Sequence, residues 1–271
     1  MLEQFRRVTA ADVGRADAAA ALDGVFAEYL VPISFSEPIY AIHVAANDVS
    51  LASSPIWYDG NGSVVAAALL GVRDTRGWVG GFGVAPAHRK RGLGRALLAE
   101  VLERAWSLSL DSVALEVLAE NVAARKTYEA ASFRTTRRLQ TLGGDAKHLG
   151  TGPADAPYAR VKPLLDVREG AAPCWQREPT SLGRQTNLHA VGETGAFCIF
   201  RHNGERAQLL KVRAGSAEEF AWLAASVVAQ SGVTRLDLFN EPEDSSAARA
   251  ARTLGWQVFH EMDEMRLERG R

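Results

Sequence analysis

A short basic turn that contains two glycines has the residue types of an anion-binding site. Basic residues 89–91 precede Gly92 and Gly94, and an apolar stripe typical of a helix begins near Arg95. Glycine lets the backbone approach an anion closely, and the first amides of a helix have no partner inside the helix. A basic loop before a helix is otherwise only a solvated surface, and the glycine spacing argues against that alternative. The pattern predicts phosphate binding by Arg89, Lys90, Arg91, Gly92, Leu93, Gly94 and Arg95.

The segment before this turn has the composition of a buried strand. Residues 78–84 are apolar and rich in glycine, and Pro86, which has no amide proton to donate to a sheet, ends the run. Gly80, Gly81 and Gly83 are unusual inside a strand. They indicate either a bulged strand that a ligand approaches closely or a strand that packs poorly.

Two more candidate residues lie on the helix that is expected after the next strand. Residues 113–118 form a short apolar run, residues 119–121 interrupt it, and a helix is predicted over 122–131. Asn121 can cap this helix, and Tyr128 lies two turns along it. From the residues alone, Tyr128 is either a core residue with a polar end or an acid. Asn121 is either only a cap or also a ligand contact.

The composition is that of a globular protein with two domains. The 271 residues exceed the usual size of one domain, with 47% hydrophobic and 23% charged residues. A net charge of -1 argues against a general nucleic-acid binder. Cys174 and Cys198 make no disulfide framework, and reduced structural thiols are expected. No apolar run reaches the roughly 20 residues of a helix that spans a membrane.

Residues 1–8 lack the apolar core of a signal peptide, so a cytoplasmic location is expected.

Periodicity and turn signals predict the elements that position these residues. The order is two helices, three antiparallel strands, the glycine turn (residues 89–95) with its helix, and then strand, helix and strand. Helices are predicted over 12–30, 36–46, 95–107 and 122–131, and strands over 56–58, 63–72, 78–84, 113–118 and 133–139. A strand, a crossover helix and a strand in this order form a right-handed unit with the glycine turn at its mouth.

The second half of the chain repeats this order in a degenerate form. Residues 143–157 contain four glycines and two prolines without periodicity, which predicts a linker or a long surface loop. A hairpin with a turn at Asn203 and Gly204 follows. Then come a helix over 217–230, a strand over 233–239, a helix over 244–253 and a final strand over 257–267. We interpret this order as an internal duplication.

The spacing around the glycine turn is that of a known family. The pattern V-x-P-x-x-R-x-x-G-x-G-x-x-L is matched by Val84, Pro86, Arg89, Gly92, Gly94 and Leu97. With Asn121 and Tyr128 on a following helix, it resembles the GCN5-related N-acetyltransferase (GNAT) superfamily over about residues 1–142. The whole chain resembles two-domain members of that superfamily in which one copy is degenerate.

The resemblance implies that acetyl-CoA or another acyl-CoA binds here and that the acyl group passes to an amine. It implies contacts of Phe82, Gly83 and Val84 with the acyl-CoA, and Val84 holds the position that supports the thioester carbonyl. It also implies that Asn121 contacts the acyl-CoA and that Tyr128 is the general acid for the departing thiolate. A phenol with a pKa of about 10 is a slightly weaker acid than a thiol at about 8.5. Proton transfer therefore needs only a modest lowering of the tyrosine pKa.

The sequence does not identify a general base. Many relatives carry a glutamate on the strand before the turn, but residues 78–84 contain no carboxylate or histidine. His88 is expected to be an exposed loop residue. Glu116 on the neighbouring strand either faces the cleft or is a paired structural carboxylate. The other candidates are a water chain and three residues in the segment that lines the acceptor side in relatives, Glu28, Tyr29 and Glu37.

The second copy departs from the pattern where chemistry would need it. Residues 214–216 lead straight into a helix, and Ala251 and Asp244 hold the places of Tyr128 and Asn121. The expected fold is α/β (α+β), with two GNAT-like domains, each a mixed and mostly antiparallel sheet flanked by helices, the second truncated. The expected domains are 1–142 with the acyl-CoA site and a degenerate 159–271, joined by a linker over 143–158. The second domain is expected to cover a sheet edge, complete the acceptor cleft or mediate association.

The leading prediction is a cytoplasmic acyl-CoA-dependent N-acyltransferase. More specifically, an acetyltransferase that modifies a small amine or a peptide amine is expected. The alternative is a non-catalytic acyl-CoA sensor or assembly module. It remains an alternative because the strand over residues 78–84 carries no carboxylate that could act as a base. Transfer to an aminoglycoside-like or amino-sugar thiol precursor is a third option. The expected partners are acetyl-CoA and the amine, with a homodimer left open. No metal, no specific nucleic acid and no membrane are expected.

Overall fold

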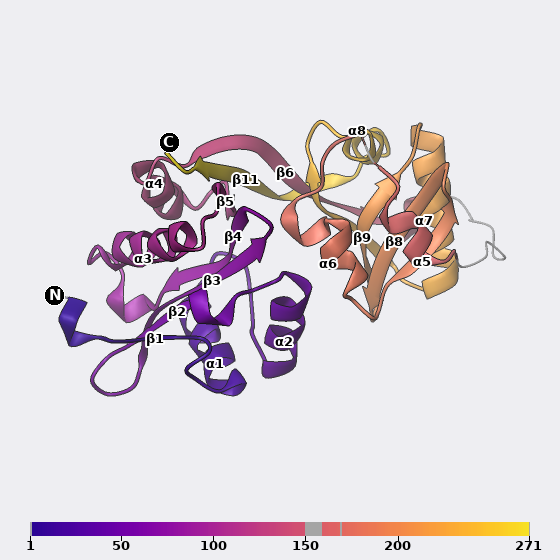
Figure 1. The fold of residues 1–271 in the computed structure, drawn as a ribbon. Coiled ribbons are helices and arrows are strands. Elements are labelled where there is room, and N and C mark those ends of the chain that lie inside the picture. The colour runs from indigo at the N-terminus through magenta and orange to yellow at the C-terminus, as the bar shows by residue number, and fades with distance from the viewer. Residues whose placement is uncertain (1, 150–158, 169, 271) are drawn as a thin grey trace. The chain divides into compact units, whose positions relative to one another are not determined.

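The computed structural model describes residues 2–149, 159–168 and 170–270 (Figure 1). The chain divides into two compact units. Unit 1 comprises Met1–Thr136 and Glu264–Arg271, and unit 2 comprises Arg137–Asp263. Each unit is built from a mixed set of strands with helices packed on it, which is an α/β arrangement as expected.

Unit 1 is a mixed sheet covered by helices on both faces. Its strands pair in the order β1-β2-β3-β4-β5, and all these pairs are antiparallel except β4 with β5, which is parallel. The strands are β1 (Arg6–Thr9), β2 (Pro55–Tyr58), β3 (Val64–Arg73), β4 (Arg76–Val84) and β5 (Ser112–Leu118). The helices are α1 (Arg15–Phe26), α2 (Glu37–Ala46), α3 (Leu93–Ser107) and α4 (Val122–Ala130), with short 3-10 helices at Leu2–Gln4, Leu51–Ser53 and Pro86–His88.

Alternation along the strands gives unit 1 two hydrophobic cores. Successive side chains of a strand point to opposite faces, so each apolar strand supplies both cores. One core contains Leu97 of α3, Tyr128 of α4 and Leu115 of β5. The other contains Leu22 of α1 and Leu69 of β3. The helices α3 and α4 therefore lie on one face of the sheet and α1 and α2 on the other (Figure 1).

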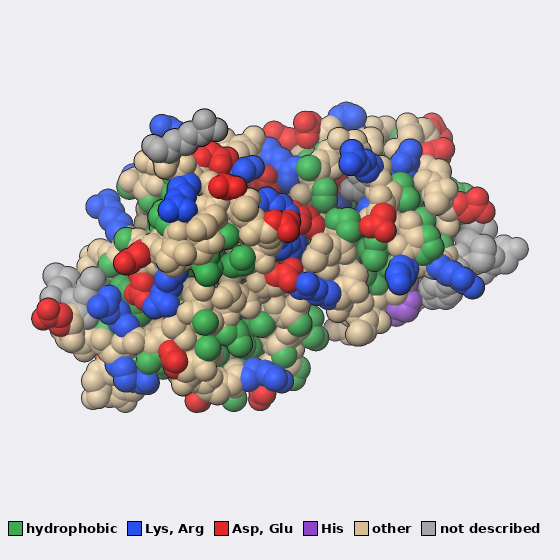
Figure 2. Space-filling view, in the orientation of Figure 1, with side chains coloured by type: hydrophobic (Ala, Val, Ile, Leu, Met, Phe, Trp, Pro, Cys, Tyr) green, Lys and Arg blue, Asp and Glu red, His purple; other side chains and the backbone are tan. Residues whose placement is uncertain are grey.

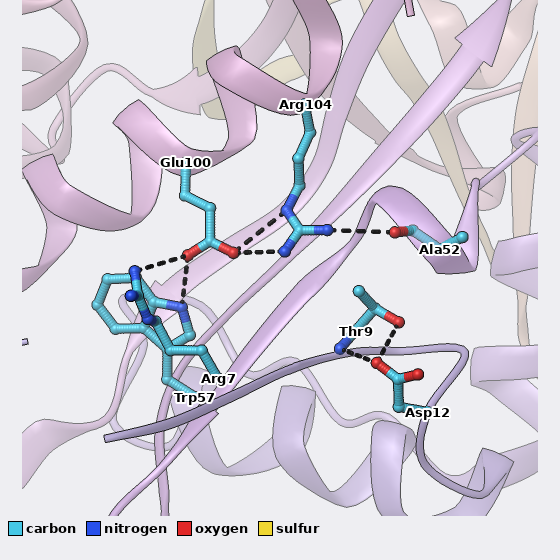
Figure 3. A network of polar contacts seen from close by, with 7 residues as sticks. All are labelled: Arg7, Thr9, Asp12, Ala52, Trp57, Glu100 and Arg104. Carbon is cyan, nitrogen blue, oxygen red and sulfur yellow. Dashed lines mark hydrogen bonds and ion pairs between the residues drawn. The ribbon is translucent and has the colours of Figure 1, made fainter. Parts of the chain in front are cut away.

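A polar network attaches α3 to the first two strands of unit 1 (Figure 3). Glu100 on α3 accepts a hydrogen bond from the Trp57 indole nitrogen at 2.9 Å and pairs with Arg104 at 2.6 Å. Arg104 donates to the Ala52 carbonyl at 3.2 Å, and an Arg7 nitrogen lies 3.9 Å from the Glu100 carboxylate. Because α3 starts at the glycine turn, these contacts also position the turn.

Unit 2 has a similar alternation of strands and helices. Its strands pair in the order β6-β10-β9-β8-β7, and only β9 with β10 is parallel. The strands are β6 (Arg134–Asp145), β7 (His189–Glu193), β8 (Ala196–Asn203), β9 (Arg206–Arg213), β10 (Arg235–Pro242) and β11 (Gln257–Glu268). The helices are α5 (Val161–Leu165), α6 (Pro179–Gly183), α7 (Ala217–Ser231) and α8 (Ser246–Thr253), with 3-10 helices at Ala146–His148 and Trp175–Arg177.

The main core of unit 2 lies between its sheet and the two longer helices. Phe220 of α7 and Ala251 of α8 pack with Phe200 of β8 in this core. A smaller hydrophobic cluster lies on the opposite face of the same strands and contains Phe197 of β8 and Leu164 of α5. Helices therefore cover both faces of this sheet as well.

Strands β6 and β11 each contribute residues to both units. β6 follows α4, but its residues from Arg137 onward belong to unit 2, where Leu142 pairs with Leu238 of β10. β11 follows α8, but its residues from Glu264 onward belong to unit 1. The strand order is β1-β2-β3-β4-β5-β11-β6-β10-β9-β8-β7, a single mixed series of eleven. Strand pairing therefore does not confirm the two separate sheets that the sequence predicts.

Strand β6 extends into the segment that was expected to be a linker, residues 143–158. Gly143 and Gly144 lie inside β6, and a Cβ at either position would overlap the ring of Phe259 or Trp256. These glycines make room for aromatic rings, whereas their composition alone indicated a loop. Residues 150–158 of the expected linker lie outside the described part of the chain.

Most of the other predicted elements are present with shifted ends. The first helix spans only Arg15–Phe26 of the predicted 12–30, and Glu28 has a left-handed φ of 61° that no helix continues through. The sequence does not predict β1 or β7, because four or five residues of mixed polarity carry no clear period. No described helix is long and apolar enough to cross a membrane.

Candidate functional site

Strand β4 contains a bulge at the point where its pairing with β5 stops. Leu69 of β3 lies opposite Gly81, and Leu70 lies opposite Val79, so Gly80 is one extra residue. The parallel register of β4 with β5 also ends at Val79. The two strands therefore separate from Gly80 onward, as the glycine content of this segment predicts.

The peptide groups of β4 beyond the bulge point alternately to β3 and to the side that β5 leaves open. The Ala85 amide donates to the Val65 carbonyl of β3 at 2.9 Å. Adjacent peptide groups of a strand point in opposite directions, so the amides of Phe82 and Val84 face away from β3. The Val84 carbonyl agrees with this direction, because it accepts a hydrogen bond from Arg89 Nε at 3.1 Å. Two of the predicted ligand-binding residues thus present backbone donors on the open side.

Internal packing leaves little room for a side chain at two of the strand glycines. A Cβ at Gly80 would lie 1.9 Å from the Trp78 ring, which covers this residue. A Cβ at Gly83 would lie 3.0 Å from the Val25 Cβ of α1. A Cβ at Gly81 would meet only ordinary contacts, at 3.6 Å or more. The packing of Trp78 and of α1 therefore explains these glycines without a ligand.

The glycine turn leaves the start of α3 uncapped by any side chain. Gly92 is the N-cap residue and has a left-handed φ of 78°, and Lys90 has a φ of 59°. The first turn of α3 carries no acidic residue, and its first amides have no partner inside the helix. The turn therefore presents backbone donors and the positive end of the helix dipole to an anion.

The basic side chains of the turn differ in their contacts. Arg89 donates to the Ala27 carbonyl at 2.8 Å and lies 3.5 Å from the Glu28 carboxylate. Together with its bond to the end of β4, these contacts connect α1 with β4 through Arg89, and its contact with a phosphate stays a prediction. Figure 2 shows acidic and basic side chains interspersed on the face in view. The basic side chains of the turn are all exposed, namely Arg89, Lys90, Arg91 and Arg95.

Replacing Gly92 by alanine tests whether this turn binds an acyl-CoA. A Cβ at Gly92 meets no atom within 4 Å, so the change acts on the backbone. The left-handed conformation costs an L-residue about 1–2 kcal/mol. We expect the dissociation constant of acetyl-CoA, measured by isothermal titration calorimetry, to rise about 5- to 30-fold. The control Gly60→Ala also meets open space, but at an ordinary φ, and should bind as the wild type does. Wild-type affinity in Gly92→Ala would contradict a role of the turn.

Tyr128 lies on the inner side of α4 and contacts the end of β4. Its buried ring lies 5.6 Å from the Phe82 ring and 5.9 Å from the Phe133 ring, between centroids. Burial, and to a smaller extent the nearby Tyr29, raises the pKa of Tyr128 far above its ordinary value. This corrects the modest lowering that the sequence argument assumed. The hydroxyl stays protonated at physiological pH and can donate a proton to an anion that forms beside it.

Asn121 is the N-cap of α4, which confirms one of the two roles left open by the sequence. Its side chain accepts a hydrogen bond from the Ala124 amide at 3.1 Å. Burial raises the pKa of Tyr29, and a hydrogen bond with the Asn121 side chain opposes that rise. Tyr29, in the segment after α1, therefore lies near both Asn121 and Tyr128.

The carboxylates considered as bases have other contacts or lie in solvent. Glu28 pairs with Arg89 and is largely exposed. Glu116 accepts a hydrogen bond from the Trp78 indole nitrogen at 2.7 Å, which is the behaviour expected of a structural carboxylate. Glu37 is exposed in the first turn of α2.

Two histidines differ from the sequence-based expectation. His88 is half-buried and packs edge-on against Phe5 at 6.1 Å, although it was expected to be exposed. His43, which was not among the predicted residues, packs on Trp78 and lies close to the Gly80 backbone. No motif contains His43. Its spacing of three residues from the buried Tyr40 on α2 is the only sequence signal that it points inward.

The equivalent turn of unit 2 is closed by its own side chains. Ser216 accepts a hydrogen bond from the Glu219 amide at 3.2 Å, and the Gly215 amide donates to the Glu219 carboxylate at 2.6 Å. Glu218 also lies in the first turn of α7. Acidic side chains therefore hold the helix start that an anion would need.

The end of α8 matches the end of α4 but carries no phenol. The Trp256 amide donates to the Ala251 carbonyl at 3.0 Å, and the equivalent bond at the end of α4 is accepted by the Tyr128 carbonyl. Ala251 and Tyr128 thus accept similar backbone bonds at the ends of their helices, and their correspondence stays a prediction. The N-cap of α8 is Ser245, one residue after the predicted Asp244.

Comparison with known sequences finds a family match within unit 1. Residues 22–133 match the sequence model of the Acetyltransferase (GNAT) family. This range contains β2 to β5, the glycine turn, α3 and α4, and it is less than half of the chain. No curated protein gives a significant sequence match.

Solved structures share the fold over almost the whole chain. A GCN5-related N-acetyltransferase from Sphaerobacter thermophilus has a TM-score of 0.70 at 17% identity, covering 98% of this chain and 96% of that one. A tandem GNAT protein from the clavulanic acid biosynthesis pathway has a TM-score of 0.67 at 16% identity, covering 98% of both chains. A putative acetyltransferase from Pyrococcus horikoshii has a TM-score of 0.63 at 15% identity, covering 98% and 89%. At these identities the similarity shows the fold. Residues 22–133 are thus similar to the Acetyltransferase (GNAT) family, and the whole chain shares its fold with GNAT structures.

Proposed function

We propose that this protein is an acetyl-CoA-dependent N-acetyltransferase that modifies a primary amine of a small molecule or peptide. The observation that best supports the proposal is that two features of an acyl-CoA site occur next to each other on one short segment. β4 separates from β5 at the Gly80 bulge, and the same strand leads into the uncapped, basic start of α3. An opened strand with free peptide groups, next to an anion-binding helix start, suits a long ligand with a thioester at one end and a pyrophosphate at the other.

Each part of the donor has a place in this proposal. The amides of residues 91–95 bind the pyrophosphate, and the exposed Lys90, Arg91 and Arg95 add charge. The open-side amides of Phe82 and Val84 bind the acyl end, where one of them donates to the thioester carbonyl. A donor fixed in this way also stabilises the oxyanion that develops during attack. Asn121 stays a cap that shapes the wall of the site.

Direct transfer accounts for all atoms without a metal or redox partner. The neutral amine attacks the thioester carbonyl, a carbon–nitrogen bond forms, and the carbon–sulfur bond breaks. The departing thiolate takes the hydroxyl proton of Tyr128. The proton that the amine nitrogen loses goes to solvent, and solvent returns one proton to the Tyr128 oxygen, so the enzyme is regenerated. The raised pKa of Tyr128 does not prevent this step, because a thiolate in the same dry surroundings is also a stronger base than in water.

We also infer that unit 2 is a degenerate second copy that does not bind acyl-CoA. The capping of α7 by Ser216 and Glu219 removes the anion site, and Ala251 removes the acid. The hairpin β8–β9, the crossover β9–α7–β10 and the helix α8 follow the order of β3–β4, β4–α3–β5 and α4. One acetyl-CoA should therefore bind per chain, with a calorimetric stoichiometry of about one.

The test of the proposed function uses the full chain in two assays. Isothermal titration calorimetry measures acetyl-CoA binding, and a thiol reagent measures CoA release with 2-phenylethylamine, spermidine, glucosamine and an unblocked tripeptide as acceptors. We expect binding and amine-dependent CoA release, with the N-acetyl product identified by mass spectrometry. The absence of acetyl-CoA binding would overturn the proposal.

A second candidate function is a non-catalytic acyl-CoA sensor or assembly module. The observation that favours it is that β4 carries no carboxylate or histidine between residues 78 and 84. The same two assays separate the candidates. Acetyl-CoA binding without CoA release for any acceptor would favour the sensor.

A further inference from the structure

His43 has a buried ring nitrogen without a partner at the place where β4 opens. The residue lies near the end of α2, three residues after Tyr40 on the same helix face. Its Nε2 atom is buried and has no hydrogen-bond partner. Buried polar atoms in proteins are almost always paired, so an unpaired nitrogen requires an explanation. A ligand that supplies the missing partner is such an explanation.

The surroundings of His43 place this nitrogen beside the opened part of the sheet. Its ring lies 5.8 Å from the Trp78 ring and 5.8 Å from the Phe35 ring, between centroids. The backbone of Gly80, the bulge residue after which β4 and β5 separate, lies close enough to His43 to raise its pKa against the effect of burial. The Trp78 indole nitrogen is engaged with Glu116 of β5 at 2.7 Å. His43 therefore lies next to Gly80, where β4 separates from β5, on the face of the sheet that α2 covers.

The His43 ring is neutral over the physiological pH range. Burial lowers its pKa to about 4, and the nearby Gly80 backbone opposes this shift. Trp78, Phe35 and Gly80 bring no charge to it. Tyr40 lies three residues earlier on α2 and Glu116 is hydrogen-bonded to Trp78, and neither is among the causes of the His43 pKa shift. A neutral imidazole has one nitrogen that accepts a hydrogen bond, and the buried Nε2 has no partner in the structure.

We propose that His43 binds the acceptor amine in its neutral form and takes up the proton that the amine nitrogen releases. The proposal rests on the transferase function proposed above. The imidazole accepts the amine N–H and aims the nitrogen lone pair at the thioester carbonyl. As the carbon–nitrogen bond forms, that nitrogen becomes acidic and its proton passes to the imidazole, which returns it to solvent. Tyr128 supplies the separate proton that the CoA thiolate takes.

The same surroundings define the class of acceptor. Phe35 also packs on Phe26 at 5.6 Å, so rings from α1, the α1–α2 segment and β4 continue along this side of the sheet. Two apolar side chains of α2, Ile39 and Ile42, are exposed. Such a wall solvates an ammonium group poorly and favours an apolar body. The acceptor is accordingly a primary amine carried on an apolar or aromatic group.

Substitution of His43 with full-length protein and 2-phenylethylamine as the probe tests the proposal. His43→Gln removes the basic nitrogen, and His43→Phe keeps a ring against Trp78 and Phe35. We expect both to lower kcat/KM about 100-fold or more, with an unchanged acetyl-CoA dissociation constant. Added imidazole should restore part of the activity of His43→Ala, which a purely structural role would not produce. The exposed His260→Gln is the control and should retain wild-type activity.

A measurement on the wild type makes the test independent of variant folding. The imidazole resonances of His43 in NMR spectra should stay those of a neutral ring down to about pH 4 and should shift when 2-phenylethylamine is added to the acetyl-CoA complex. Near-normal kcat/KM in both His43→Gln and His43→Phe would overturn the role of His43. A higher kcat/KM for glucosamine or spermidine than for 2-phenylethylamine would overturn the acceptor class. A wild type that binds acetyl-CoA but acetylates no amine would instead overturn the proposed function itself.

Discussion

Replacing Tyr128 by phenylalanine should lower kcat about 10²- to 10⁴-fold and leave the acetyl-CoA dissociation constant within about threefold of the wild type. The change removes one hydroxyl from a buried ring that contacts Phe82 and Phe133, and it keeps those ring contacts. Only proton donation to the departing thiolate is lost. The thiolate then leaves unprotonated in surroundings that stabilise charge poorly.

The pH dependence of the wild type gives a second expectation for Tyr128. Its pKa is raised in the folded protein, so the hydroxyl remains protonated as the pH increases. The kcat profile should therefore show no decline from Tyr128 ionisation below about pH 10. A basic limb between pH 7 and 9 that is lost in Tyr128→Phe would contradict the raised pKa.

The test of Tyr128 measures kcat and the acetyl-CoA dissociation constant for Tyr128→Phe and for a control variant. Tyr58→Phe removes another tyrosine hydroxyl, on β2, and should leave kcat unchanged. Wild-type kcat in Tyr128→Phe would exclude Tyr128 as the acid, and a parallel loss of acetyl-CoA affinity would indicate a structural role instead.

Replacing Arg177 by methionine should lower the free energy of unfolding of unit 2 by about 3–5 kcal/mol. Arg177 is 1% exposed, and its guanidinium lies 2.5 Å from the Glu241 carboxylate, which is itself 5% exposed. The same guanidinium donates to the carbonyl of Asn240 at 3.0 Å and to the carbonyl of Leu210. The variant leaves the Glu241 carboxylate buried without its counter-charge, and β9 and β10 lose a shared donor.

A double-variant cycle read by urea unfolding distinguishes charge from packing at this pair. Trp175, next to Arg177 and buried, reports on unit 2 by fluorescence. The double variant Arg177→Met, Glu241→Leu should recover most of the lost stability, because no unpaired charge remains. A loss of less than about 1 kcal/mol in Arg177→Met would show that water or other groups replace the pair.

Local sequence signals predicted the elements of the candidate site well. The glycine turn, the strand before it and the helix after it depend on residues within about 20 positions of one another, and proline, glycine and apolar periodicity act over that range. Gly92 is in the left-handed conformation, and Asn121 is an N-cap, as their types indicate. The bulge at Gly80 also agrees with the glycine content of the strand.

Interactions between distant segments account for what the sequence analysis missed. The contacts of Arg89 with Ala27 and Glu28, more than 60 positions away, could not be predicted from the glycine turn, and its binding of a phosphate stays a prediction. Gly143 and Gly144 have the composition of a loop, but rings of Phe259 and Trp256 require them in a strand. The direction of the Tyr128 pKa shift depends on burial, which only the packed structure determines.

The sequence by itself determined the α/β succession of elements, the glycine turn before α3, the cap of α4 and the position of Tyr128, because each depends on local backbone preference or short spacing. Only the tertiary structure decided that β6 and β11 supply residues to both units, that Glu219 closes the start of α7, and that His43 meets Gly80. These outcomes depend on which distant segments share a sheet or a core. Burial and pairing of that kind follow from the whole packed chain and leave no mark in a short stretch of residues.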